Sequence, residues 1–343
     1  MTYQHFVSSQ AHTIGSVEST LRSICYILPG RFKDAEILSE SVYSSLKLIG
    51  HYHDSILAPE AIRQQPHAPT SFNRYTKALL KGFFYKKIAY LLTAIRAFSV
   101  VMEMFAAKRS KEMHEKVTMF IEVSRLICRL VLLKLSKFKM ILHSQLPDRD
   151  YDITKLQPQS EQELSWTGKR TAKEHLSVDA MYKDNADFNP SMQYLLSKAM
   201  VEPSEDPLNL TSELTGNRLF GEYLYIFRPL AYLLAIRYYG KSSYKPWLLS
   251  LLLEVYSIST SYDLKSLSFK EDVKLLEQEE IGKRMSLWIY YLLRNPVYDT
   301  IAKPRLAGLA EWTSTKPLIS IIGSVINDYT PLWENYHFYT TGF

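Results

Sequence analysis

The sequence predicts an all-α protein, a helical bundle built from two helical halves that a long polar loop joins. Three observations lead to this prediction. Apolar residues recur at helical spacing through most of the 343-residue chain. No stretch alternates apolar and polar residues for long enough to indicate a sheet. Prolines and acidic residues gather between residues 145 and 216. We expect the two flanking halves, residues 1–144 and 217–343, to pack as one domain.

The N-terminal half carries four predicted helices, the last two of which are basic and amphipathic. The first helix stops at Pro29-Gly30, a pair that breaks helices. Asp34 follows, and its side chain suits the N-cap of the second helix. Three prolines around or within residues 60–71 make this stretch a connector. The expected helices span residues 17–28, 34–57, 72–108 and 112–146.

Residues 145–216 are predicted to form a flexible acidic insert. They contain thirteen acidic residues, seven lysines and arginines, and five prolines. A segment of this composition buries too little apolar surface to offset the entropy that its chain loses on folding. The sequence does not indicate a role for this insert.

The C-terminal half opens with the most informative stretch of the chain, residues 220–257. Two strongly apolar arms, residues 223–236 and 247–253, flank a basic turn centred on Gly240, which is the pattern of a helical hairpin. Helical spacing continues over residues 270–293 and stops at Asn295-Pro296. Two short helices, residues 306–312 and 318–326, and an aromatic tail follow. We expect the tail to dock on the protein's own surface, on a partner or at a bilayer interface.

The hairpin contains a charge where an apolar environment is expected. Arg228 and Pro229 interrupt its first arm, and a charge in an apolar run requires a partner, a cavity or an interface. The arms are short, so a peripheral or shallow re-entrant hairpin fits better than two full spans. A spanning hairpin and an ordinary buried hairpin remain as alternatives.

A second apolar segment, residues 119–142, is not expected to span a membrane alone. Its apolar residues contribute about −8 kcal/mol to insertion, whereas its six charges cost about +18 kcal/mol. Glu122, Arg125 and Arg129 fall on one helical stripe. This pattern suits an amphipathic helix that lies in an interface or packs on neighbouring helices.

The net charge of +6 is unevenly distributed along the chain. Residues 77–144 contain fourteen lysines and arginines against four acidic residues. The same block is rich in leucine, isoleucine, phenylalanine and methionine, whereas nucleic-acid-binding arms are usually polar. We therefore expect an anionic lipid membrane rather than nucleic acid as the partner, with a solvated basic face as the alternative.

No motif predicts a catalytic, cofactor or metal site. Gly168-Lys169-Arg170 lacks the upstream glycine of a phosphate-binding loop. His51 and His53 have the chemistry of metal ligands, but such pairs are common at exposed helix ends. The two cysteines indicate buried thiols rather than disulfides. No secretory signal is recognised, so we expect synthesis in the cytosol.

Five blocks of residues resemble one family when they are taken together and in order. The matching residues are Gly30, Arg31, Phe32, Asp34, Leu38, Ser39, Glu40, Val42, Tyr43 and Ser44; Met102-Glu103-Met104 with Ala106-Ala107-Lys108; Glu222, Leu224, Tyr225, Ile226, Arg228, Pro229 and Leu230 with Lys245-Pro246-Trp247-Leu248-Leu249; residues 290–294 with Pro296, Tyr298 and Asp299; and Asp328-Tyr329, Pro331, Trp333 and Phe338-Tyr339. Outside the insert, the chain resembles the peroxin-16 family of peroxisome-biogenesis membrane proteins, and we expect a fungal-type member.

The resemblance implies a non-enzymatic role at the peroxisomal membrane, with the endoplasmic reticulum as a second location. Animal members are integral proteins that receive peroxin-3 and help to target other membrane proteins, with peroxin-19 carrying the cargo. Some fungal members are peripheral and restrain peroxisome division through lipid binding. We therefore expect a factor that recruits or docks other peroxins and membrane proteins. The alternative is a lipid-binding peripheral regulator of membrane remodelling and division.

Twelve residues are candidate membrane or partner contacts. We expect Arg228 to pair with an internal acid such as Glu222 or with lipid phosphate; the alternative is a buried ion pair within the helix bundle. Arg294 is expected in a helix stop with a local ion pair to Asp299. The twelve candidates are Arg31, Phe32, Asp34, Arg125, Arg129, Arg228, Pro229, Lys245, Trp247, Arg294, Tyr298 and Trp333.

Overall fold

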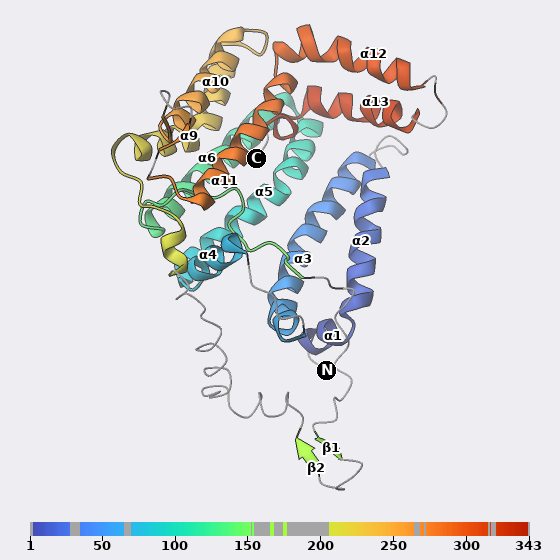
Figure 1. The fold of residues 1–343 in the computed structure, drawn as a ribbon. Coiled ribbons are helices and arrows are strands. Elements are labelled where there is room, and N and C mark those ends of the chain that lie inside the picture. The colour runs from blue at the N-terminus through green and yellow to red at the C-terminus, as the bar shows by residue number, and fades with distance from the viewer. Residues whose placement is uncertain are drawn as a thin grey trace.

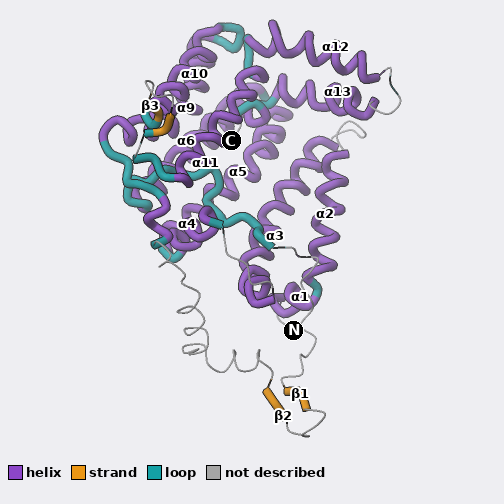
Figure 2. The backbone as a smooth tube through the Cα atoms, in the orientation of Figure 1, coloured by secondary structure: helices purple, strands orange, loops and turns teal. Residues whose placement is uncertain are grey.

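The computed structural model describes residues 3–27, 35–64, 70–151, 153, 165–167, 174–176, 206–263, 268–270, 272–314, 316 and 320–341. Helices dominate these residues, as Figure 2 shows, and confirm the all-α prediction. Two small antiparallel ribbons accompany the helices. They pair β1 (Ser165–Thr167) with β2 (Glu174–Leu176) and β3 (Tyr262–Asp263) with β4 (Ser268–Phe269).

Three helices form the N-terminal layer, which lies beside the centre of the molecule (Figure 1). The first of them was not expected from the sequence, and the third runs beyond its predicted end at residue 57. Val7, Leu57 and Ala61 are buried where the first and third helices meet. The three helices are α1 (Tyr3–Ser9), α2 (Ala11–Ile27) and α3 (Ala35–Gln64).

The first and third of the three central helices begin at side-chain caps. The Thr70 hydroxyl accepts a hydrogen bond from the Asn73 amide at 3.2 Å, and the Ser110 hydroxyl accepts one from the Met113 amide at 3.1 Å. The single helix expected over residues 72–108 is divided at Lys81-Gly82. The three helices are α4 (Ser71–Leu80), α5 (Phe83–Arg109) and α6 (Lys111–Leu135).

Helix α6 ends at Leu135 rather than at the expected residue 146. Lys137 and Phe138 adopt left-handed backbone conformations with φ of 58° and 57°, which a continuing helix does not permit. The Phe138 amide then closes the helix end by donating to the Leu133 carbonyl at 2.9 Å. The chain leaves α6 as an extended segment that carries Met140 into the core.

Both ends of the expected insert pack into the folded part of the chain. Leu146 is buried at its beginning, and Thr211 and Leu214 are buried at its end. A backbone bridge joins Lys139 to Glu213. The packed region therefore reaches beyond the expected boundaries at residues 144 and 217. Most of the remaining insert lies outside the described residues, and its flexibility stays a prediction.

Helices α9 (Gly216–Tyr239) and α10 (Tyr244–Ser259) form the expected hairpin. Gly240, with φ of 82°, ends α9 and turns the chain. The two helices touch at Gly221, where an added Cβ would lie 2.6 Å from the Thr260 hydroxyl. α6 lies against α9, so the two halves of the chain are in direct contact.

The last elements run from below the hairpin to α12 and α13 at the upper right of Figure 1, and then back to the core. Residues 298–302 form a π-helical turn, η4 (Tyr298–Ala302). The tail docks on the protein's own bundle, where Phe338 is buried. The remaining elements are η2 (Pro207–Leu210), α11 (Leu275–Ser286), η3 (Leu287–Leu293), α12 (Lys303–Ser314), α13 (Ser320–Asn335) and η5 (His337–Tyr339).

Candidate functional site

Helix α10 turns its polar side inward and its apolar side outward. Glu254 is 1% exposed, whereas Leu252 is 56% exposed. A surface helix of a water-soluble protein normally shows the reverse arrangement. Its inward polar residues are Ser250, Glu254 and Ser257, and its exposed apolar residues are Tyr244, Leu248, Leu249, Leu252, Val255 and Tyr256.

Helix α9 has the same inverted arrangement. It buries Glu222 and Arg228 and exposes Phe220, Phe227 and Leu234 at intervals of seven residues along one stripe. The rings of Phe220 and Tyr256 meet edge to face at 6.1 Å and join this stripe to that of α10. We call the joined surface the hairpin face: Phe220, Phe227, Leu234, Leu248, Leu249, Leu252, Val255 and Tyr256.

The charged stripe of α6 also points inward. Glu122, Arg125 and Arg129 are buried, and the Arg125 guanidinium contacts the Glu122 carboxylate at 2.7 Å. Burial, reinforced by neighbouring Arg125, lowers the pKa of Arg129 to about 10. Of the two arrangements expected for this amphipathic helix, the structure shows packing of the charged stripe on neighbouring helices.

Arg228 forms a buried ion pair within the bundle, as one of the expected alternatives has it, but its partner is Glu254 rather than Glu222. α10 returns antiparallel to α9 and brings Glu254 opposite Arg228. Glu222 lies six residues before Arg228, about 9 Å along the helix axis, so it faces different neighbours. The Tyr291 hydroxyl donates to Glu254 at 2.6 Å and completes the buried pair.

Glu222 is the partner of Arg284 on α11. The guanidinium nitrogens lie 2.8 and 2.9 Å from the two carboxylate oxygens, which is a bidentate contact. Burial disfavours the charged form of Arg284, but Glu222 outweighs it and raises the pKa of the guanidinium. The same groups bind the backbone of Ile141: its amide donates to Glu222 at 3.2 Å, and its carbonyl accepts from Arg284 at 2.8 Å.

Arg294 binds the C-terminal tail instead of forming the expected local ion pair with Asp299, whose side chain is exposed. Its guanidinium donates to the Thr340 carbonyl at 3.0 Å and to the Thr341 carbonyl at 3.1 Å. It also donates to the Ser250 hydroxyl at 3.1 Å. Arg294 therefore ties the tail to α10.

Buried Glu103 holds the same tail from the side of α5. Its carboxylate accepts the amides of His337 at 2.6 Å and Phe338 at 3.0 Å. His114 on α6 contacts the same carboxylate at 2.8 Å. Helices α5 and α6 and the C-terminal tail thus meet at a single carboxylate, which the sequence did not single out as a contact.

The structure separates the twelve candidate contacts by burial. Arg125, Arg129, Arg228, Pro229, Arg294 and Tyr298 are buried in the bundle; Trp247 and Trp333 are partly buried; Lys245 is exposed; and Arg31, Phe32 and Asp34 lie outside the described residues. The indole of Trp247 donates to the Tyr291 carbonyl at 3.0 Å. Among the described candidates, Lys245 therefore offers the most surface to a membrane or partner.

Sequence reasoning missed the leucines of the hairpin face as contacts. The sequence does contain a signal for this surface. At helical spacing, the apolar residues Leu248, Leu252 and Val255 fall on the side of α10 away from Ser250 and Glu254. The periodicity defines two sides of α10, but only the packed structure shows which side points outward.

The histidines considered as metal ligands have other contacts. Nδ1 of His53 lies 2.6 Å from the Glu18 carboxylate, and its Nε2 lies 2.7 Å from the Tyr3 hydroxyl. Both ring nitrogens of His53 are therefore engaged within the N-terminal layer. His51 instead lines the rim of a cavity between α3 and the start of α5.

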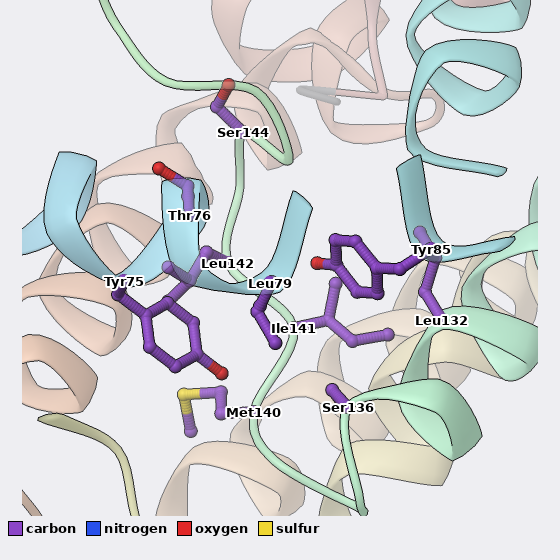
Figure 3. A pocket seen from close by; sticks show the side chains of 10 residues that line it. All are labelled: Tyr75, Thr76, Leu79, Tyr85, Leu132, Ser136, Met140, Ile141, Leu142 and Ser144. Atoms are coloured by element: carbon purple, nitrogen blue, oxygen red, sulfur yellow. The ribbon is translucent and has the colours of Figure 1, made fainter. Parts of the chain in front are cut away.

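Two cavities lie near the start of α5. The first, enclosed by Tyr75, Tyr85 and Met140 among others (Figure 3), measures about 10 Å³, which is room for one water molecule. The second measures about 450 Å³ and carries Lys77, Lys81 and Lys86 among its lining residues. Asp54 and Asp148 also line it, so its charge is mixed.

Two of the described helices, α5 and α9, are long and apolar enough to cross a membrane by length and composition. Together with the hairpin face and the charged interior, they suit an all-helical protein of the membrane-associated class. A charged interior beneath an apolar outer surface suits a helix pair whose outside meets lipid or a partner.

Comparison with known proteins narrows this class to one family. The family described as "Peroxisomal membrane protein (Pex16)" matches residues 1–335. The chain therefore belongs to the Pex16 family of peroxisomal membrane proteins, which confirms the resemblance found in the sequence. A fungal affiliation within the family stays a prediction.

Three relatives share different lengths of the chain. Peroxisome biogenesis protein 16 of Arabidopsis thaliana is 22% identical, with 99% of each chain covered. Peroxisomal membrane protein PEX16 of Schizosaccharomyces pombe is 21% identical, over 89% of this chain and 87% of the relative. Peroxisome biogenesis factor 16 of Dictyostelium discoideum is 35% identical over 37% of this chain and only 32% of the relative. No solved structure matches the chain.

Proposed function

We propose that this chain is a non-enzymatic assembly factor that docks other peroxins and membrane proteins at the peroxisomal membrane. The partners expected are peroxin-3 and the soluble cargo carrier peroxin-19. Membership of a family of peroxisomal membrane proteins supports the location. An assembly factor needs surfaces that bind other proteins in addition to the surface that meets the membrane.

The observation that carries this proposal is a second exposed apolar surface, which lies on α12 and α13 rather than on the hairpin. Helices α12 and α13 pack on each other and project at one end of the molecule (Figure 1). Exposed apolar patches on a folded chain commonly mark interaction sites. The large apolar residues that α12 and α13 expose are Leu309, Trp312, Ile321, Ile322 and Val325.

Capture of purified peroxin-3 by the full chain in mild detergent tests the proposal. We expect a stable complex, and we expect Trp312→Ser combined with Ile322→Ser to weaken it at least about tenfold, because exposed aromatic and aliphatic anchors dominate such interfaces. Arg305→Ala, which changes an exposed residue of α12, is the matched control. Failure of the unmodified chain to capture peroxin-3 would remove the main support for a docking role.

A second candidate function is that of a lipid-binding peripheral regulator of membrane remodelling and division. The turn of the hairpin favours it, because Arg237, Lys241 and Lys245 are exposed there. Tight binding to acidic vesicles without any peroxin would support this candidate. Binding that requires peroxin-3 would support the assembly factor.

A further inference from the structure

The turn between α9 and α10 is basic and aromatic. Arg237, Lys241 and Lys245 are exposed there, and no acidic residue occurs between Glu222 and Glu254 in the sequence. This group of positive charges is complementary to the negative charge of lipid phosphate groups.

Tyrosines accompany these cations at the turn. Tyr238 is 81% exposed, and its ring meets that of Tyr239 edge to face at 4.7 Å. Tyr244 is exposed as well, and the Lys245 ammonium lies 4.7 Å from the centre of the Tyr239 ring. Exposed tyrosines beside lysine and arginine are typical of the headgroup layer of a membrane.

The hairpin face continues from this turn along the outside of both helices. It reaches Phe220 and Tyr256 at the other end of the hairpin. Because Arg228 and Glu254 pair inside, no charged side chain of either helix is exposed between Phe220 and Ile236 or between Pro246 and Ser259. A bilayer can therefore contact the whole length of this side of the hairpin.

We infer that the α9–α10 hairpin lies flat in one leaflet of a bilayer that contains acidic phospholipids. The hairpin face meets the acyl chains, and Arg237, Lys241 and Lys245 bind the phosphate groups at the headgroup level. This inference concerns how the chain sits on the membrane and holds for either function proposed above.

Charge at the turn argues against insertion of the hairpin end-on. A re-entrant hairpin would carry Arg237, Lys241 and Lys245 into the hydrocarbon, where cations are strongly disfavoured. A flat hairpin leaves the same three cations at the surface. Of the peripheral and shallow re-entrant arrangements expected from the sequence, the charge at the turn therefore favours a peripheral, flat one.

The N-terminal layer argues against a spanning hairpin. α2 and α3 lie on the side of the central helices opposite to α10, and run beside them (Figure 1). α2 exposes Thr13, Thr20 and Arg22 to the surroundings. If α9 and α10 stood upright across a bilayer, these polar side chains would be drawn into hydrocarbon. A flat hairpin keeps α2 in water.

Depth measurements with the full chain test this inference. Single cysteines replace Leu248, Leu252 and Tyr256 in turn and carry an environment-sensitive fluorophore, while the native Cys25 and Cys128 are buried and serve as the unlabelled background. The chain binds phosphatidylcholine vesicles that contain phosphatidylserine and quencher lipids of shallow or deep position. A cysteine at Thr20 on α2 is the matched control.

A flat hairpin predicts similar, shallow quenching at all three positions and none at Thr20. Deepest quenching at Leu252 would show a spanning hairpin, and deepest quenching toward the turn would show end-on insertion; either result overturns the inference. Absence of quenching at every position also overturns it, because the hairpin face would then not contact the bilayer.

Charge reversal at the turn tests the headgroup contact. Lys241→Glu with Lys245→Glu removes two cations and adds two acids, so we expect vesicle binding to fall at least about 25-fold, given about fivefold for each basic residue near an acidic surface. Inorganic phosphate in place of lipid should not compete. Unchanged vesicle binding, or displacement by phosphate, would contradict a lipid headgroup site. Loss of vesicle binding with peroxin-3 capture intact separates this site from the docking function.

Discussion

The Arg284 guanidinium on α11 and the Glu222 carboxylate on α9 form a bidentate pair, although 62 positions separate them in the sequence. Both residues are buried, and both also bind the backbone of Ile141 in the segment after α6. One pair thus holds three parts of the chain together. Such a contact fixes geometry more than it adds stability, because burying two charges costs nearly as much as their attraction returns.

Removal of one partner of this pair should destabilise the protein strongly. Arg284→Met leaves the Glu222 charge buried and unpaired, so we expect a loss of about 3–5 kcal/mol in the free energy of unfolding, and the same for Glu222→Leu. The double variant should lose less than the sum of the two. Denaturant unfolding in mild detergent measures all four proteins.

The control for this cycle is Lys116 with Glu112, an exposed pair one turn apart on α6. Substitution of Glu112 by Gln should change the free energy of unfolding by no more than about 0.5 kcal/mol. Additive effects of the two changes at Glu222 and Arg284 would show that the buried pair does not act as a unit.

Gly221 allows α9 and α10 to touch. An added Cβ would lie 2.6 Å from the Thr260 hydroxyl and 3.3 Å from the Ser257 carbonyl, so Gly221→Ala should cost about 1–3 kcal/mol. Gly282→Ala on α11 is the matched control, because nothing lies within 4 Å of its Cβ position. That change should stabilise the helix by about 0.5–1 kcal/mol. Equal melting temperatures for the two variants would contradict the close contact.

Arg294 holds the tail against the bundle. Arg294→Gln removes two charge-assisted hydrogen bonds to the Thr340 and Thr341 carbonyls, each worth about 1.5–3 kcal/mol. We expect the amides of residues 337–341 to exchange with deuterium at least about tenfold faster. Arg305→Gln, exposed on α12, should leave exchange unchanged. Unaltered exchange in Arg294→Gln would show that the tail is held by other contacts.

Acid should destabilise the fold through His143. Burial, and then the charge of Arg96, lower the pKa of His143 to about 3, so the folded protein keeps this ring neutral while the unfolded chain protonates it near pH 6.5. The neutral ring therefore contributes fully to the free energy of unfolding above pH 6.5, and this contribution is lost as the pH falls toward 3. In that range the free energy of unfolding changes by about 1.4 kcal/mol per pH unit through this one group.

The free energy of unfolding measured against pH checks this expectation, with His143→Gln for comparison. The variant should lose that part of the acid sensitivity, because glutamine has no proton to take up in this range. The backbone of residue 143, which donates to Glu280 at 2.8 Å, remains in place in the variant. Identical slopes in the two proteins would assign the acid sensitivity to other groups.

The sequence predicted the turns and helix ends that are set by residues adjacent along the chain. The turn at Gly240 and the interruption at Asn295-Pro296 lie where expected, because glycine at positive φ and proline act on the local backbone. The helical periods also predicted the hairpin. The class of fold was therefore accessible without any long-range information.

Contacts between distant residues were not accessible from the sequence. The hairpin sequence offers Arg228 two acidic residues, Glu222 and Glu254, and only the packing of α10 on α9 selects Glu254. The end of α6 depends on the left-handed conformations of Lys137 and Phe138, which neither residue type favours. The tail contacts of Arg294 span 46 and 47 positions and follow no local pattern.

Deletion of the gene, followed by counting of peroxisomes with a fluorescent matrix marker, tests the proposed assembly role most directly. The account predicts cells without importing peroxisomes, with the marker in the cytosol and peroxisomes restored by the intact chain. Fewer and enlarged peroxisomes that still import the marker would favour the division regulator. A normal population of importing peroxisomes would contradict both proposed functions.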